Sequence, residues 1–243
     1  MMEVWNKLVD KFILCFVEDN RWLYMVRGLG VTLEVTYGSY TLTRLISPVD
    51  YAAKVLESEG TSLEAKRMMI NVLKYIDTAY VYWNKNVGQT AGEYNSVVSL
   101  YKQYKKYATA SVVNRQAVDM SAVSDALENA QLNLETAPKF RFNINSAYTG
   151  TVTVSYTASS GETVAKAFDV VNGNCNGNSY IEIGFKAYYL TDTITITTAN
   201  GTANYSLANY YYYSAVEAGS PLANLLNALY AYCETARLYK DSV

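Results

Sequence analysis

The strongest constraint on the fold is a string of residues that occurs twice. The pattern Tyr-x-x-Thr-Ala-x-x-Tyr occupies residues 75–82 and again residues 232–239. Around both copies, apolar residues recur at spacings of three and four, which is typical of an amphipathic helix. Periodicity alone explains shared apolar positions, but it does not explain the shared Tyr, Thr and Ala identities. The repetition therefore predicts two related modules that each end in a helix.

Alternating apolar residues, the pattern of half-buried strands, precede each of these helices. In the first block the expected strands cover residues 11–16, 22–26, 31–35 and 40–42. In the second block they lie within residues 132–134, 140–144, 152–156, 181–183 and 194–196. Turn residues separate them at Gly38, Gly150, 159–161, 172–178 and Asn200-Gly201.

Helix start signals follow each strand block. Pro48, Ser62 and Pro221 suit the first turns of three helices, and Gly60 and Gly219 suit the breaks before the last two. We therefore predict an α+β fold of two related modules, each an antiparallel β-sheet followed by a helical hairpin, with a sandwich-like second sheet. The expected division is a reduced N-terminal module (1–86), a connecting helix (87–120) and a complete C-terminal module (121–243).

The connecting helix has a tyrosine stripe at helical spacing, Tyr94, Tyr101, Tyr104 and Tyr107, with lysines beside it. The lysines are Lys102, Lys105 and Lys106. One interpretation is a basic aromatic surface for an anionic polymer. The other is a helix that packs its tyrosine stripe on a module, and we favour this second interpretation.

Composition argues against catalysis. The chain has 24 Tyr and no His, with a net charge of −2. Tyrosine suits contact surfaces, because its large apolar ring carries a polar tip. A chain without His lacks the commonest general base, the usual zinc ligand and every Ser-His or Cys-His nucleophile pair. We therefore expect no enzyme activity.

The enzyme class that is hardest to exclude is glycoside hydrolysis, because it needs only two carboxylates. Candidate acids on or beside the second sheet are Glu128, Glu135, Asp169, Glu182 and Asp192. None forms a local pair with a distinctive spacing, so solvated strand-end charges are the favoured interpretation. The Gly-rich loop at 173–177 lacks the Lys-Ser/Thr of a phosphate loop.

No metal or cofactor is expected. Cys15, Cys175 and Cys233 are far apart and odd in number, which argues against a metal site or disulfide. We expect Cys15 and Cys233 to be small apolar core residues and Cys175 to lie in a polar loop. Alternating asparagines at 172–178 supply oxygen ligands without carboxylates, so calcium binding there would be weak and a long hairpin turn is the simpler interpretation.

Aromatic clusters supply the candidate ligand-binding residues. Four consecutive tyrosines at 210–213 cannot all face one side of a helix, so some must be exposed or meet a partner. Rings on a β-sheet face can stack on sugars. The candidates are Tyr211, Tyr213, Tyr188, Tyr189 and Trp22. The alternative is that these rings pack inside the modules, and we favour it.

The second half of the chain resembles a known class of modules through three short motifs. They are Thr191-Asp192-Thr193-Ile194-Thr195-Ile196, Tyr205-Ser206-Leu207-Ala208-Asn209-Tyr210 and residues 225–232. They resemble the strand-plus-helical-hairpin modules of unknown function near the C-termini of large secreted or surface proteins of Gram-positive gut bacteria. The resemblance covers residues 121–243 well and 31–86 less well. It implies a surface or extracellular setting and an accessory, adhesive role.

The function predicted from sequence is thus a non-catalytic structural or adhesive interaction module, with carbohydrate binding as the alternative and a His-free glycosidase as a distant one. Expected partners are proteins or polysaccharides. Nucleic acid is not expected, because the composition has no excess of basic residues. Membrane insertion is not expected, because the longest apolar run is 12–17. The expected setting is extracellular or at the cell surface for a longer or processed chain, and cytoplasmic for a full product.

Overall fold

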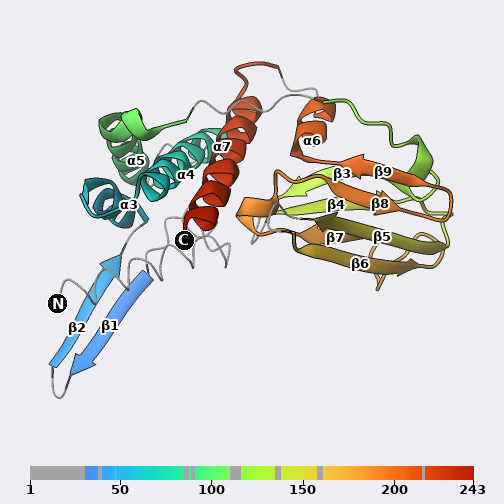
Figure 1. Ribbon diagram of the computed structural model, residues 1–243, viewed down its shortest axis with the longest axis horizontal. Coiled ribbons are helices and arrows are strands. Elements are labelled where there is room, and N and C mark those ends of the chain that lie inside the picture. The colour runs from blue at the N-terminus through green and yellow to red at the C-terminus, as the bar shows by residue number, and fades with distance from the viewer. Residues whose placement is uncertain are drawn as a thin grey trace. The chain divides into compact units, whose positions relative to one another are not determined.

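A computed structural model of the chain shows helices and antiparallel sheets in two compact units (Figure 1). It describes residues 31–37, 40–46, 48–84, 88, 91–109, 116–134, 138–157, 161–214 and 217–243. The first unit combines Met1–Val112 with Ala218–Val243, and the second is Val113–Glu217. The predicted α+β class with antiparallel sheets is confirmed. The expected strands at 11–16 and 22–26, together with Cys15 and Trp22, lie outside the described residues.

The first unit contains a β-hairpin and the long helices of the chain. Its elements are β1 (Val31–Tyr37), β2 (Tyr40–Ile46), α3 (Pro48–Glu57), α4 (Leu63–Tyr82), α5 (Ala91–Tyr104), the 3₁₀ helix η2 (Lys105–Tyr107) and α7 (Pro221–Ser242). Strands β1 and β2 pair antiparallel from Val31 opposite Ile46 to Tyr37 opposite Tyr40. The predicted helix starts at Pro48, after Ser62 and at Pro221 all match.

The core of the first unit lies between α4 and α7, the two helices that carry the repeated string. Tyr75 and Tyr232 are the first residues of the two copies of the string. Both are buried, and their ring centroids lie 6.3 Å apart. The equivalent threonines are buried too, and each hydroxyl donates to carbonyls one turn earlier in its own helix. The last tyrosines differ, because Tyr82 is exposed and Tyr239 is buried.

This packing places α7 in the helical unit, whereas the sequence assigned it to a module with the strands. The physical reason is that the buried stripes of α4 and α7 are long enough to cover each other. The boundaries expected at 86 and 120 therefore differ from those of the compact units. The origin of the helices from duplicated modules stays a prediction.

The second unit is built around two antiparallel sheets (Figure 1). One has the order β3-β4-β7 and the other β6-β5-β8-β9. The elements are η3 (Ser121–Val123), β3 (Leu127–Asn133), β4 (Lys139–Ile144), β5 (Gly150–Thr157), β6 (Thr163–Val170), β7 (Tyr180–Gly184), η4 (Ala187–Tyr189), β8 (Ile194–Thr197), β9 (Thr202–Tyr205) and α6 (Leu207–Tyr213). Strand β6 was not predicted.

The two sheets share an aromatic core. Strand β4 alternates buried Phe140 and Phe142 with half-buried polar residues, because successive side chains of a strand point to opposite faces. Both phenylalanine rings contact Tyr205 of β9 edge-on, each at 5.4 Å between centroids. Each such ring contributes about 1.5–3 kcal/mol through burial. The sheets therefore pack face to face, and their other faces remain for other roles.

The asparagine-rich segment after β6 forms two consecutive tight turns. Asn172 and Gly173 have φ values of 48° and 68°, and Asn176 and Gly177 have 53° and 84°. Positive φ at both central residues is the type I′ geometry, which Asn-Gly adopts readily. The Asn174 side-chain oxygen accepts a hydrogen bond from the Gly177 amide at 2.8 Å. The predicted single long turn is thus a pair of short ones.

Candidate functional site

The structure buries most of the aromatic residues proposed from sequence as ligand contacts. Tyr188 and Tyr189 are each 2% exposed, and Tyr211 is 5% exposed. Tyr188 and Tyr189 lie in η4 rather than on a sheet face, with their rings 4.3 Å apart. Burial leaves these rings no surface for stacking on a sugar. Trp22 lies outside the described residues.

Tyr213 is the one proposed tyrosine with an exposed ring in the described part of the chain, at 54%. It forms an edge-to-face pair with Tyr212, which is also exposed, at 5.3 Å. The Tyr213 hydroxyl donates a hydrogen bond to the Val118 carbonyl, which holds the ring on the second unit. This pair ends a short helix and offers a small aromatic surface.

A larger polar surface covers the outer face of the β3-β4-β7 sheet, and we call it the polar sheet face. Strand register arranges its side chains in three rows, because residues opposite each other on neighbouring strands share a face. The rows, read from β3 to β7, are Asn133, Lys139, Gly184; Gln131, Arg141, Glu182; and Asn129, Asn143, Tyr180. Amides, opposite charges and one aromatic ring thus occur together.

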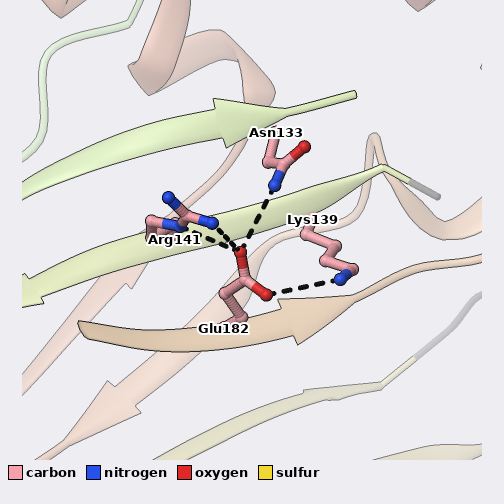
Figure 2. A network of polar contacts seen from close by, with 4 residues as sticks. All are labelled: Asn133, Lys139, Arg141 and Glu182. Carbon is pink, nitrogen blue, oxygen red and sulfur yellow. Dashed lines mark hydrogen bonds and ion pairs between the residues drawn. The ribbon is translucent and has the colours of Figure 1, made fainter. Parts of the chain in front are cut away.

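Glu182 is the centre of the hydrogen-bond network on this face (Figure 2). Its Oε1 accepts hydrogen bonds from Arg141 Nε at 2.9 Å and Arg141 Nη2 at 2.7 Å, and from Asn133 Nδ2 at 3.4 Å. Its Oε2 accepts one from Lys139 Nζ at 3.3 Å. Figure 2 shows these donors converging from β3 and β4 on the carboxylate of β7. The network therefore links all three strands of the sheet.

The electrostatics fix Glu182 as a carboxylate. Partial burial raises the pKa of its carboxyl, but hydrogen bonds and positive charge from Arg141 and Lys139 outweigh burial and leave the pKa below its ordinary value. A general acid for glycoside cleavage needs the opposite shift, to hold its proton near neutral pH. Glu182 therefore does not suit the role of general acid.

The other candidate acids are dispersed. Glu128 and Asp169 are exposed, and Asp169 accepts a hydrogen bond from the Thr151 hydroxyl at 2.9 Å. Asp192 is half-buried in the loop after η4, and Glu135 lies outside the described residues. Among the residues with a described position, no group of three or more Cys, Asp or Glu side chains could hold a metal ion.

The aromatic ring of the face is held by a cation. The Arg141 guanidinium lies over the Tyr180 ring, 4.1 Å from its centroid, while its nitrogens bond to Glu182. Arginine can stack and donate at once, because its charge is spread over a plane. Both residues are half-buried, which fixes their positions before any ligand arrives.

Sequence reasoning selected Glu182 from this face and missed its other members. A signal was present, because Lys139-Phe140-Arg141-Phe142-Asn143 and Tyr180-Ile181-Glu182-Ile183 alternate polar with apolar residues. That alternation places the polar side chains on one face of each strand. What it does not give is the register of β4 against β7, which are separated in the chain by β5 and β6.

No protein-family model, curated protein or solved structure matches this chain. Where the structure describes helices, none is long and apolar enough to cross a membrane.

Proposed function

We propose that this chain is a non-catalytic adhesive interaction module and that the polar sheet face is its contact surface for carbohydrate. The observation that carries the proposal is the co-occurrence of four amides, Asn129, Gln131, Asn133 and Asn143, with Tyr180 in one strand register. Side-chain amides both donate and accept, which matches the hydroxyl groups of sugars. A tyrosine ring adds an apolar surface for the face of a sugar ring.

The dimensions of the face suit a short oligosaccharide. Neighbouring strands lie about 4.8 Å apart and alternate residues about 6.8 Å apart, so three rows on three strands cover roughly 10 by 14 Å. An open sheet face favours an extended glycan over a small molecule that needs enclosure.

The locked carboxylate supports binding over catalysis. Glu182 orients Arg141 and Lys139 and keeps its negative charge at neutral pH. Preorganised polar groups cost less to order when a ligand binds. The proposed setting, a secreted or surface protein of a bacterium, rests on the resemblance of residues 121–243 to surface-protein modules.

Binding to an array of neutral glycans tests the proposal, with single substitutions on the face. Gln131→Ala and Asn143→Ala remove outward amides without touching the core, and each should weaken binding about three- to tenfold, the value of one or two hydrogen bonds. The matched control is Asn204→Ala, because Asn204 is an exposed amide on β9, on the outer side of the other sheet. If all three variants lost glycan affinity equally, or if none did, the polar sheet face would not be the contact surface.

The distant alternative, a glycosidase without His, makes a different prediction. If Glu182 were its acid, Glu182→Gln would abolish cleavage of a glycan that the wild type hydrolyses. We expect no hydrolysis by the wild type on any retained glycan, because the Glu182 carboxyl is held deprotonated. Release of reducing sugar that disappears in Glu182→Gln would contradict the non-catalytic assignment.

A further inference from the structure

The helical unit has a second surface with its own chemistry, formed by α5, η2 and the side of α4 that packs on them. Between Glu93 and Asp119 the sequence has no acidic residue, and it has Lys102, Lys105 and Lys106 within five positions. These three lysines are exposed. The chain as a whole has a net charge of −2, so this positive segment is a local departure from the average.

Two helices bring lysines to the same tyrosine. The Lys106 Nζ lies 5.0 Å from the centroid of the Tyr107 ring, and the Lys66 Nζ of α4 lies 5.5 Å from it. Farther along the two helices, the Lys74 Nζ lies 5.4 Å from the Tyr101 ring. The rings are half-buried, so they act as supports that hold the ammonium groups near one another. We call Lys66, Lys102, Lys105, Lys106 and Tyr107 the basic patch.

The charges of the basic patch are not neutralised within the described protein. Lys74 forms an ion pair with Asp77 at 2.7 Å, whereas Lys66, Lys102, Lys105 and Lys106 form no ion pair with any described residue. Lys102 at the end of α5 and Lys106 in η2 carry like charges, which repel each other. An anionic partner would relieve this repulsion, and several such charges together give strong, salt-dependent attraction.

The chemistry of the patch selects among anionic partners. Each cation is a lysine ammonium, a compact charge without the planar fork that reads phosphate or base edges. The Tyr107 ring already has ammonium groups beside it, so it is a poor platform for stacking of nucleic-acid bases. Lys102 lies in the last turn of α5, and Lys105 and Lys106 lie in η2, so the ammonium groups are separate charges that suit a flexible anionic chain.

We propose that the basic patch binds an anionic polysaccharide, whose acidic groups the four lysines neutralise. This inference is independent of the sheet face in the second unit, because it uses different residues and a ligand of different charge. The basic patch would bind anionic sugars and the polar sheet face would bind neutral glycans. One protein would then contact two components of a polysaccharide layer.

Salt-gradient elution from immobilised heparin tests the proposal with the full chain, and neutral dextran serves as the uncharged comparison. The test variant replaces Lys102, Lys105 and Lys106 by Gln. The matched control replaces Lys166, Lys186 and Lys240 by Gln, which lowers the net charge by the same three charges outside the patch. Circular dichroism of both variants checks that the fold is intact.

The expected result is that wild type and control elute together and the patch variant loses at least tenfold in affinity for heparin, while the three proteins behave alike on dextran. The slope of log affinity against log salt should also fall by roughly two in the patch variant only. Equal loss in both variants would overturn the proposal, because net charge alone would then explain retention. Tighter binding of single-stranded poly(dT) than of heparin would overturn it in favour of nucleic acid. Absence of heparin binding by the wild type would also overturn it.

Discussion

The two outer faces of the sandwich cover the same core but have opposite chemistry. The face of β6-β5-β8-β9 consists mostly of small residues, with rows Ala167, Thr153, Thr197, Thr202 and Ala165, Ser155, Thr195, Asn204. Its hydroxyl groups pair with each other across strands, as in Thr157 with Thr163 at 3.0 Å. The polar sheet face has long charged and amide side chains instead. The polar sheet face is the one that we propose as the contact surface.

The comparison separates stability from recognition. Threonine side chains fit a pleated surface well and pair with neighbours across strands. The threonine-rich face of β6-β5-β8-β9 therefore stabilises its own sheet. Arg141, Lys139 and Glu182 form a network across strands, and long side chains of this kind lose much conformational freedom when they are ordered. A network that is ordered in advance is useful when it positions donors for a partner.

The largest expected effect tests the shared core. Phe140→Ala removes a fully buried ring that contacts Tyr205 and Phe185 and should lower the free energy of unfolding by about 3–5 kcal/mol. Urea denaturation followed by fluorescence measures it. A loss below about 1 kcal/mol would mean that the two sheets do not share one core and that their faces cannot be compared as parts of one sandwich.

The next effect contrasts one carboxylate on each face. Glu182→Gln removes charge-assisted hydrogen bonds from Arg141 and Lys139 and should cost about 1–2 kcal/mol. Asp169→Asn on the other face should cost less than about 0.5 kcal/mol, because Asp169 is exposed. The same denaturation series compares the two variants. Equal costs would mean that the network adds nothing beyond an ordinary surface charge.

The contribution of Glu182 should depend on pH in a defined direction. Its pKa is lowered in the folded protein, so its stabilisation is present above the ordinary glutamate value of about 4.3 and is lost as pH falls through the lower folded pKa. Wild type and Glu182→Gln should therefore differ most near neutral pH and converge in acid. A difference that grows as pH falls would contradict the assignment of Glu182 as a stabilised carboxylate.

The smallest effect concerns the threonine face. Replacing Thr197 and Thr202 together by Val removes a hydroxyl pair at 3.3 Å but keeps β-branched side chains. Stability should change by less than about 0.5 kcal/mol, and glycan binding should be unchanged. Thermal unfolding and the glycan array provide the two measurements. If this double variant lost glycan retention, the threonine face would take part in binding, and the proposed contact surface would be wrong.

Much of the secondary structure was predictable, because it depends on local periodicity. The starts of α4 and α7 match their Ser62 and Ser220 caps, and the clear alternation in β4, β5 and β8 marks those strands. Strand β6 escaped prediction because exposed Ala165 and Ala167 interrupt the alternation, and its fully buried residues, Phe168 and Val170, lie only at one end. The pairing of α4 with α7 joins segments that are far apart in the chain, so no local pattern indicates it.

The candidate site was predictable only in part. Glu182 was recognised as a candidate carboxylate, but its partners follow from a strand register set by contacts between β4 and β7. For the consecutive tyrosines we favoured packing over ligand contact, and Tyr188 and Tyr189 are buried. The Tyr189 ring packs against Tyr156, which is distant in sequence. Residue type indicates what a side chain can do, whereas burial depends on the whole fold.

The central claim is that one outer face of the sandwich binds glycan and the other does not. The most direct measurement is a nuclear magnetic resonance titration of the ¹⁵N-labelled chain with the neutral oligosaccharide that the array retains most strongly. Saturable shift changes should cluster in β3, β4 and β7, around Gln131, Asn143 and Tyr180, while the Thr195 and Asn204 signals stay in place. Shift changes centred on β8 and β9, or confined to the Tyr212 and Tyr213 pair, would contradict it.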